Sequence, residues 1–144
     1  MEIYKGIATF SGIAIGKVLY YSRGEYQIRQ CLVSNIKKEI SDFQEARLQA
    51  VHKLHELYEA SRLLNEQEAH VFLRQIKLLE SESYQNAIES SIAHEKVNAA
   101  YAVMINRDEL VETFRNLEEP VIRRRINDMQ EISNRLIQIL GGAA

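Results

Sequence analysis

The feature that most limits how this chain can fold is a long stretch without helix breakers. Between Ser34 and Leu140 there is no glycine, and Pro120 is the one proline. The same stretch is rich in leucine, glutamate, glutamine, alanine, arginine and isoleucine, most of which favour helices. Because glycine and proline are the residues that usually end helices, we predict that this part of the chain is helical nearly throughout.

Apolar residues in this stretch recur every three or four positions, which is the spacing of one helix face. The pattern predicts a long first helix from about residue 34 to residue 64, with Ser34 as its N-cap. After a break, a second helix carries Phe72 and Leu79 on its apolar face. Ser81 is a capping residue that can begin a short third helix, so the second and third helices should form one kinked arm.

Two more helices complete the predicted body. Asn98 can cap a helix that extends through Phe114 to Leu117, and Pro120 is well placed in the first turn of the last helix. A pair of glycines at 141 and 142 should stop that helix. The predicted fold class is therefore mainly α: a helical bundle of four main helices with a kinked short arm.

The beginning of the chain has a different composition. It contains Gly6, Gly12 and Gly16 among isoleucine, valine, leucine and tyrosine, which is typical of strands and turns. We predict a strand segment over residues 1–22 and a helical domain over residues 23–144. Two or three strands alone are only marginally stable. The segment should therefore either pack on the bundle or join a sheet that is supplied by sequence missing from this chain.

Size and composition limit the class of protein. A chain of 144 residues with 46% hydrophobic and 26% charged content can bury one ordinary core. No apolar run approaches the roughly 20 residues needed to span a bilayer, and the first residues do not resemble a secretory signal. We therefore expect a cytoplasmic protein with no membrane partner.

The net charge argues against a nucleic-acid-binding protein, and the cysteines and histidines argue against a metal-binding one. The net charge is −2 and the pI is about 6.1, so we expect no nucleic-acid partner. The one basic run, Arg123 to Arg125, is interpreted as a solvated helix face. Cys31 is the only cysteine, so no intrachain disulfide or paired-thiolate zinc site can form, and the four histidines show no ligand spacing. We expect no metal site.

The opening residues resemble a known family. Residues 6–18 read G-I-A-T-F-S-G-I-A-I-G-K-V, which is similar to the opening G-I-x-A-S-P-G-I-A-x-G-K-A of Enzyme I of the bacterial phosphoenolpyruvate:sugar phosphotransferase system. Phe10 and Ser11 depart from that pattern. Phe72 with residues 76–81 resembles the family segment I-F-E-A-H-x-x-L-L-x-D, and residues 125–136 resemble E-R-A-x-D-x-x-D-I-x-x-R-L. The resemblance covers the whole chain.

This resemblance implies a division of labour. In Enzyme I, phosphoenolpyruvate bound in a carboxy-terminal barrel phosphorylates a histidine of an α/β subdomain, which passes the phosphoryl group to the carrier HPr. The helical subdomain only receives HPr. The family's active histidine lies in a downstream T-S-H segment, so the resemblance implies no catalytic residue and no cofactor in this chain, with magnesium expected only for the parent enzyme. The fragment alone is expected to be inactive, and its partners are HPr and its own missing α/β and carboxy-terminal domains.

Position-by-position matching to the family also implies a docking surface. Its residues are Glu66, Glu68, Val71, Gln75, Leu78, Glu82, Phe114 and Arg125. A groove with an apolar floor and an acidic rim would suit a carrier whose active-site face is basic. Val71 and Leu78 could instead be core residues.

The arm departs from the family in ways that affect docking. Leu73-Arg74-Gln75 stands where the family has E-A-H, and Lys77 and Ser81 replace residues that are commonly apolar and acidic. The acidic rim is therefore weakened, which fits either a carrier with a different face or a divergent paralogue with another partner. A second interpretation, from a different class, is a self-contained helical adaptor or a homodimeric bundle in which the strand segment pairs with another chain.

Overall fold

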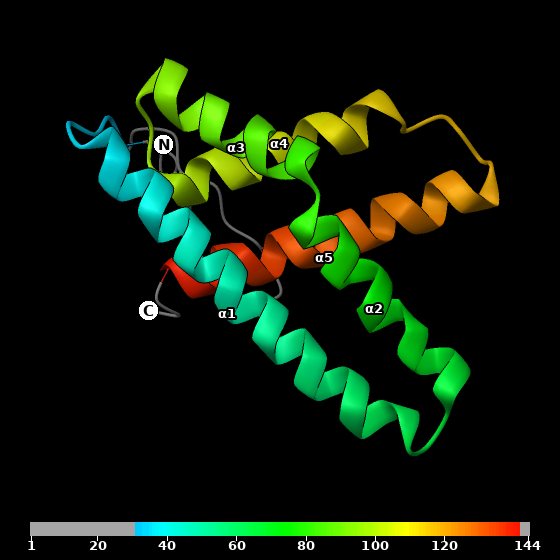
Figure 1. Cartoon of the computed structure of the whole chain (residues 1–144). Helices are drawn as coiled ribbons and strands as arrows, with labels where there is room; N and C mark the ends of the chain where they lie inside the picture. The colour runs from blue at the N-terminus through cyan, green and yellow to red at the C-terminus, as the bar shows by residue number, and fades with distance from the viewer. Residues whose placement is uncertain (1–30, 142–144) are drawn as a thin grey trace, which may run out of the picture.

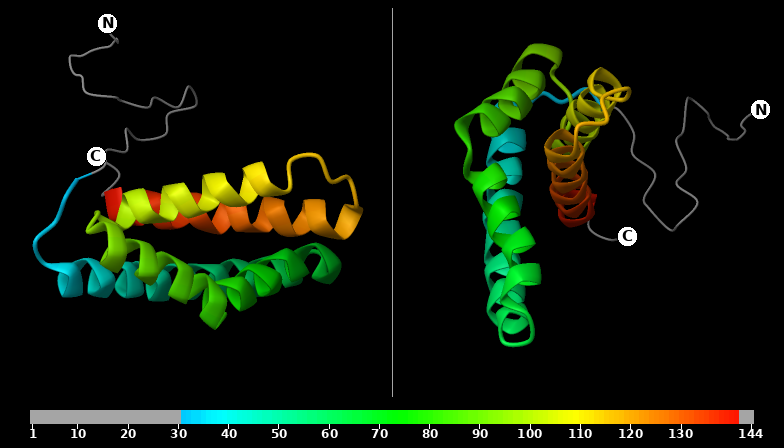
Figure 2. Two further views of the ribbon diagram at one scale, coloured as in Figure 1. Left: turned by 90° about the horizontal axis from the view of Figure 1, so that it is seen from above. Right: turned by 90° about the vertical axis from the view of Figure 1, so that its right-hand side faces the viewer.

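The computed structural model describes residues 31–141, which form five helices connected by short turns. The helices are α1 (Ile36–Arg62), α2 (Glu66–Glu80), α3 (Glu82–Glu95), α4 (Ala99–Thr113) and α5 (Pro120–Gly141). α1 and α2 form one antiparallel hairpin, α4 and α5 form another, and the two hairpins lie in two layers (Figures 1 and 2). The predicted mainly α bundle with a kinked arm is confirmed. The strand segment predicted over 1–22 lies outside the described residues.

The N-cap of the first helix lies one residue later than expected. Asn35, and not Ser34, is the N-cap of α1, because the Asn35 Oδ1 accepts a hydrogen bond from the Lys38 backbone N–H at 3.0 Å. Both residues are of capping type, so propensity alone does not separate them. Asn65 caps α2 in the same way, and its Oδ1 accepts from the Glu68 N–H at 3.1 Å.

The start of α4 is capped from another helix. Asn98 precedes α4 as expected, but its side chain makes no capping bond and instead accepts a hydrogen bond from the Cys31 N–H at 2.8 Å. The Glu39 carboxylate of α1 accepts from the Ala99 N–H at 2.8 Å. A carboxylate at a helix N-terminus also interacts favourably with the helix dipole. This contact ties the beginning of α4 to α1, 60 residues away in sequence.

The end of α4 corrects the sequence prediction. The helix ends at Thr113, so Phe114 is its C-cap and Leu117 lies beyond it. Leu117 is 43% exposed, so continuing the helix would bury little apolar surface. The chain must also reverse before Pro120, and the residue before a proline is disfavoured in a helix. Pro120 itself is the first residue of α5, as predicted.

One apolar core lies between the two layers and holds the arm in place. The inward face of α1 meets residues from α2, α3 and α5. The largest fully buried apolar side chains are Phe43, Leu54, Leu79, Ile88, Ile92, Val97, Val103, Met104, Ile132 and Leu136. Because Leu79 is fully buried and lies two residues before the bend, the orientation of the α2–α3 junction is fixed by core packing. None of the five helices has an apolar stretch long enough to cross a bilayer.

Candidate functional site

The bend between α2 and α3 is built on one serine. Ser81 is both the C-cap of α2 and the N-cap of α3, with extended backbone angles φ −72° and ψ 140°. Its hydroxyl donates to the Leu78 carbonyl at 2.9 Å and accepts from the Tyr84 N–H at 3.3 Å. A single side chain therefore satisfies backbone groups of two helix ends, which stabilises the bend.

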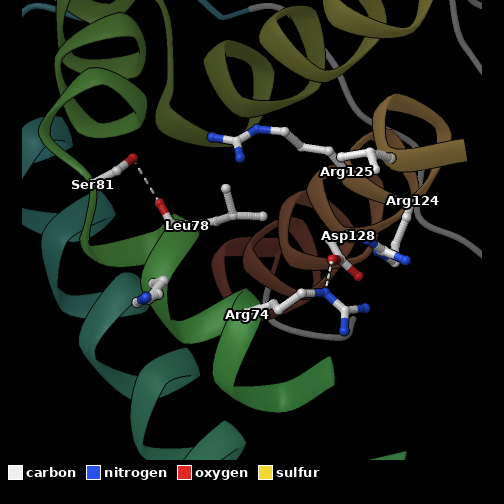
Figure 3. Close-up of a pocket in the computed structure, with 8 residues that line it drawn as sticks. Arg74, Leu78, Ser81, Arg124, Arg125 and Asp128 are labelled. Atoms are coloured by element: carbon white, nitrogen blue, oxygen red, sulfur yellow. Dashed lines mark hydrogen bonds and ion pairs between the residues drawn. The ribbon is translucent and has the colours of Figure 1, made fainter. Parts of the chain in front are cut away.

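Two surface cavities adjoin this bend. One of about 300 Å³ lies between α2 and α5, and one of about 170 Å³ extends toward α4. Leu78, Ser81 and Arg125 line both of them. The side chain of Arg125 extends from α5 toward the bend (Figure 3). The two cavities are therefore adjacent parts of one concave surface, which we call the arm groove.

The larger cavity is strongly basic. Arg74 and Lys77 of α2 and Arg124 and Arg125 of α5 line it, with Asp128 as its one carboxylate. Leu78 and Val121 supply apolar surface.

A buried polar network lies beneath this cavity. The Asp128 carboxylate is 6% exposed and accepts from the Arg74 Nε at 3.0 Å. Gln75, which is 2% exposed, donates from its Nε2 to the Glu131 Oε1 at 2.6 Å and to the Asp128 Oδ1 at 3.5 Å. These contacts connect α2 to α5, and a buried carboxylate requires such partners because its desolvation is costly. The network fixes the separation of the two helices that line the cavity.

The smaller cavity is lined in part by a buried hydroxyl pair. The Tyr84 hydroxyl and the Ser133 Oγ are 2.9 Å apart and join α3 to α5. Burial raises the pKa of Tyr84 to about 12, while the hydrogen bond to Ser133 and the charge of Arg107 act in the opposite direction. Tyr84 is therefore protonated at neutral pH and acts as a structural hydrogen-bonding group.

The structure brings together some of the eight docking residues predicted from the sequence and separates others. Leu78 and Arg125 line both cavities, and Glu82 lies in the first turn of α3 beside the bend. Leu78 is also a core residue at 8% exposure, which confirms that suggestion, while its docking role stays a prediction. Val71 is half-buried on α2, and Phe114 is half-buried at the end of α4.

The side chain of Gln75 is directed away from the surface. It is bound to Asp128 and Glu131 inside the α2–α5 interface, so the structure gives it an internal role, and its contact with a partner stays a prediction. Glu66 and Glu68 are exposed in the first turn of α2. They lie 12 and 10 residues before Leu78, or roughly 18 and 15 Å along the helix.

The charge of the larger cavity differs from the acidic rim that the family resemblance implies for the docking surface. The rim of the larger cavity is basic, because Arg74, Lys77, Arg124 and Arg125 all reach it, while Glu66 and Glu68 lie at the far end of α2. The basic run of α5 is also more than a solvated face. Arg124 and Arg125 line the cavity and Arg123 does not. Helix spacing places Arg74 and Lys77 on one face, which is a sequence signal for this site, but their position opposite α5 requires the tertiary structure.

Residues of metal-ligand type do not cluster in the described part of the chain. No group of three or more histidine, cysteine, aspartate or glutamate side chains in residues 31–141 is placed to hold a metal ion.

Comparisons with known proteins agree on one family. A family model described as PEP-utilising enzyme, N-terminal, matches residues 5–125. The phosphoenolpyruvate-protein phosphotransferase of Mycoplasma capricolum is 28% identical over 139 residues, which are 95% of this chain and 24% of that protein. The protein of the same name from Haemophilus influenzae is 29% identical over 140 residues, covering 94% of this chain and 24% of that protein. The chain thus spans about a quarter of the length of these relatives.

A solved structure has the same fold. The NMR solution structure of an Enzyme I protein matches with a TM-score of 0.74 and 21% sequence identity, covering 80% of this chain and 48% of that chain.

Proposed function

The chain belongs to the PEP-utilising enzyme N-terminal family, and we propose that its helical body is the domain through which a phosphoenolpyruvate-protein phosphotransferase docks its phosphocarrier HPr. The parent protein would be a cytoplasmic transferase of a sugar phosphotransferase system. Its phosphohistidine, magnesium and phosphoenolpyruvate sites would lie in the part of the protein beyond this chain. This domain would hold the carrier while the rest of the enzyme transfers the phosphoryl group.

The arm groove carries this proposal. Leu78 and Arg125, two residues that the family resemblance assigns to docking, line both cavities at the α2–α3 bend. Partly buried apolar surface flanked by charges is typical of a protein interface, where the apolar contact supplies affinity and the flanking charges direct encounter. The bend is held by core packing and by Ser81, so the surface is largely pre-formed, which lowers the entropic cost of binding.

The test is a heteronuclear NMR titration of the labelled chain with unphosphorylated HPr from the same organism. We expect shifts at the end of α2, the start of α3 and the first turns of α5. Arg125→Ala should weaken binding about tenfold, because it removes a side chain that lines both cavities of the proposed contact. Leu78→Glu should abolish binding, but Leu78 is mostly buried, so its fold is first checked by circular dichroism.

Leu48→Glu is the matched control. It places the same charge on an apolar residue that is 58% exposed on α1, where no docking is proposed, so binding should be unchanged. Shifts that map to another face, or affinity that is insensitive to Arg125→Ala in a folded protein, would refute docking at the arm groove.

The basic rim favours one alternative, a divergent paralogue with a different partner. HPr is expected to present a basic face, and four cations in the larger cavity would oppose it. Absence of any shift at high HPr concentration, in a folded chain, would support this alternative over carrier docking.

A further inference from the structure

The larger cavity of the arm groove contains an excess of positive charge that the protein does not neutralise. Asp128 is its one carboxylate, and that carboxylate is already paired with the Arg74 Nε at 3.0 Å. Three cationic side chains remain: Lys77, Arg124 and Arg125. Across residues 31–141, no ion pair or side-chain hydrogen bond involves any of these three.

Some other exposed cations of the same domain do have partners. Lys38 pairs with Asp42 of the same helix at 2.8 Å, and Arg115, just beyond the end of α4, pairs with Glu112 at 2.7 Å. The domain therefore has the means to neutralise surface cations locally. It does not do so in the cavity, where cations from two helices face a shared space.

The position of the arginines on α5 adds to this imbalance. Arg124 and Arg125 follow within two turns of the helix start at Pro120, and the first turn contains no acidic residue. The N-terminal end of a helix carries partial positive charge, so cations close to it gain no favourable interaction with the helix dipole. Glu119 caps the Ile122 N–H at 3.0 Å and only partly offsets the positive charge. A bound anion would relieve the repulsion among the cations.

We propose that this cavity is a binding site for a phosphate oxyanion. Guanidinium groups bind phosphate through paired hydrogen bonds, and the Lys77 ammonium adds a third donor group from the opposite helix. The volume of about 300 Å³ admits a phosphate group together with part of the molecule that bears it. Arg74, held in position by Asp128, forms the wall on the α2 side. The proposal is independent of carrier docking, because it concerns an anion, whereas the proposed carrier presents a basic face.

The experiment is an NMR titration of the chain with inorganic phosphate at constant ionic strength, with chloride as the balancing anion. We expect saturable shifts at Lys77, Arg124 and Arg125 with a dissociation constant in the millimolar range. Arg124→Gln and Lys77→Gln should each weaken phosphate binding about tenfold, since each removes a charge-assisted contact. Arg123→Gln is the matched control: it makes the same change one residue away, at a side chain that does not line the cavity, and binding should be unchanged.

A second titration distinguishes two sources of the phosphate group. O-phosphoserine serves as the probe for a phosphoryl group carried on a protein side chain, and inorganic phosphate as the probe for a free anion. Tighter, Arg124-dependent binding of phosphoserine would indicate a phosphorylated partner, whereas tighter binding of inorganic phosphate would indicate a free ligand. Shifts that do not saturate, or that respond equally to Arg123→Gln and Arg124→Gln, would overturn the proposal. HPr binding is measured separately through Leu78→Glu, so either proposal can fail alone.

Discussion

Tyr84 gives the helical body a specific response to alkaline pH. Its ring is 7% exposed, and its hydroxyl lies 2.9 Å from the Ser133 Oγ at the α3–α5 contact. Burial raises the pKa of Tyr84 to about 12 in the folded protein. In the unfolded chain the side chain is solvated and its pKa returns to about 10.

The sign and size of the effect follow from proton linkage. Between about pH 10 and pH 12 the unfolded chain loses the Tyr84 proton while the folded protein keeps it, so the unfolded state binds fewer protons. The free energy of unfolding therefore falls as pH rises through this window. At about 1.4 kcal/mol per pH unit, the total loss due to Tyr84 is about 2–3 kcal/mol, and below about pH 9 the residue makes no contribution to the slope.

Tyr84→Phe isolates this contribution. Near neutral pH the variant should be less stable by about 1 kcal/mol, because the hydrogen bond with Ser133 is lost. Above about pH 10 the wild type should lose stability faster than the variant, so the two unfolding curves should converge and then cross. The measurement is urea denaturation followed by far-UV circular dichroism at a series of pH values.

Tyr101→Phe is the matched control, because Tyr101 is a half-buried tyrosine of the same domain. Lysines and the other tyrosines titrate in all three proteins, so only the difference between wild type and variant reports on Tyr84. An unfolding free energy with the same alkaline slope in wild type and Tyr84→Phe would refute the reasoning.

Two further predictions concern helix ends. Ser81→Ala should lower the free energy of unfolding by about 1–2 kcal/mol in urea denaturation, because it removes one hydroxyl that serves both α2 and α3. Ser83→Ala, on the exposed surface of α3, is the control. Equal losses in the two variants would contradict a special role for Ser81 at the bend. Lys96→Gly should raise the thermal midpoint, with a gain of about 1 kcal/mol, because Lys96 has φ 55° in the left-handed region that glycine adopts at little cost. Lys53→Gly within α1 should instead lower stability by about 1 kcal/mol, and a loss in both variants would show that the backbone at residue 96 is not strained.

Much of the fold follows from local sequence. The glycine-free stretch, the apolar spacing and the capping residues predict five helices and the bend at Ser81, because these depend on interactions a few residues apart. The errors also have local causes. Ser34 and Asn35 are both good caps, and the end of α4 depends on how much apolar surface lies beyond Thr113.

The character of the arm groove could not be predicted in the same way. Sequence similarity indicates which residues lie on the arm, but not what each side chain faces. Gln75 lies inside the α2–α5 interface because α5 presents Asp128 and Glu131 to it. Glu66 is acidic as expected but lies at the far end of α2 from the cavity.

The sequence by itself determined the family, the helical class and the approximate bounds of the helices, since all three are encoded in short-range patterns. Only the tertiary structure decided the charge of the cavity. Arg124 is separated from Lys77 by 47 positions along the chain, and the two line one cavity because α2 and α5 pack across a shared core. Electrostatic character depends on distances in space, and packing between helices sets those distances.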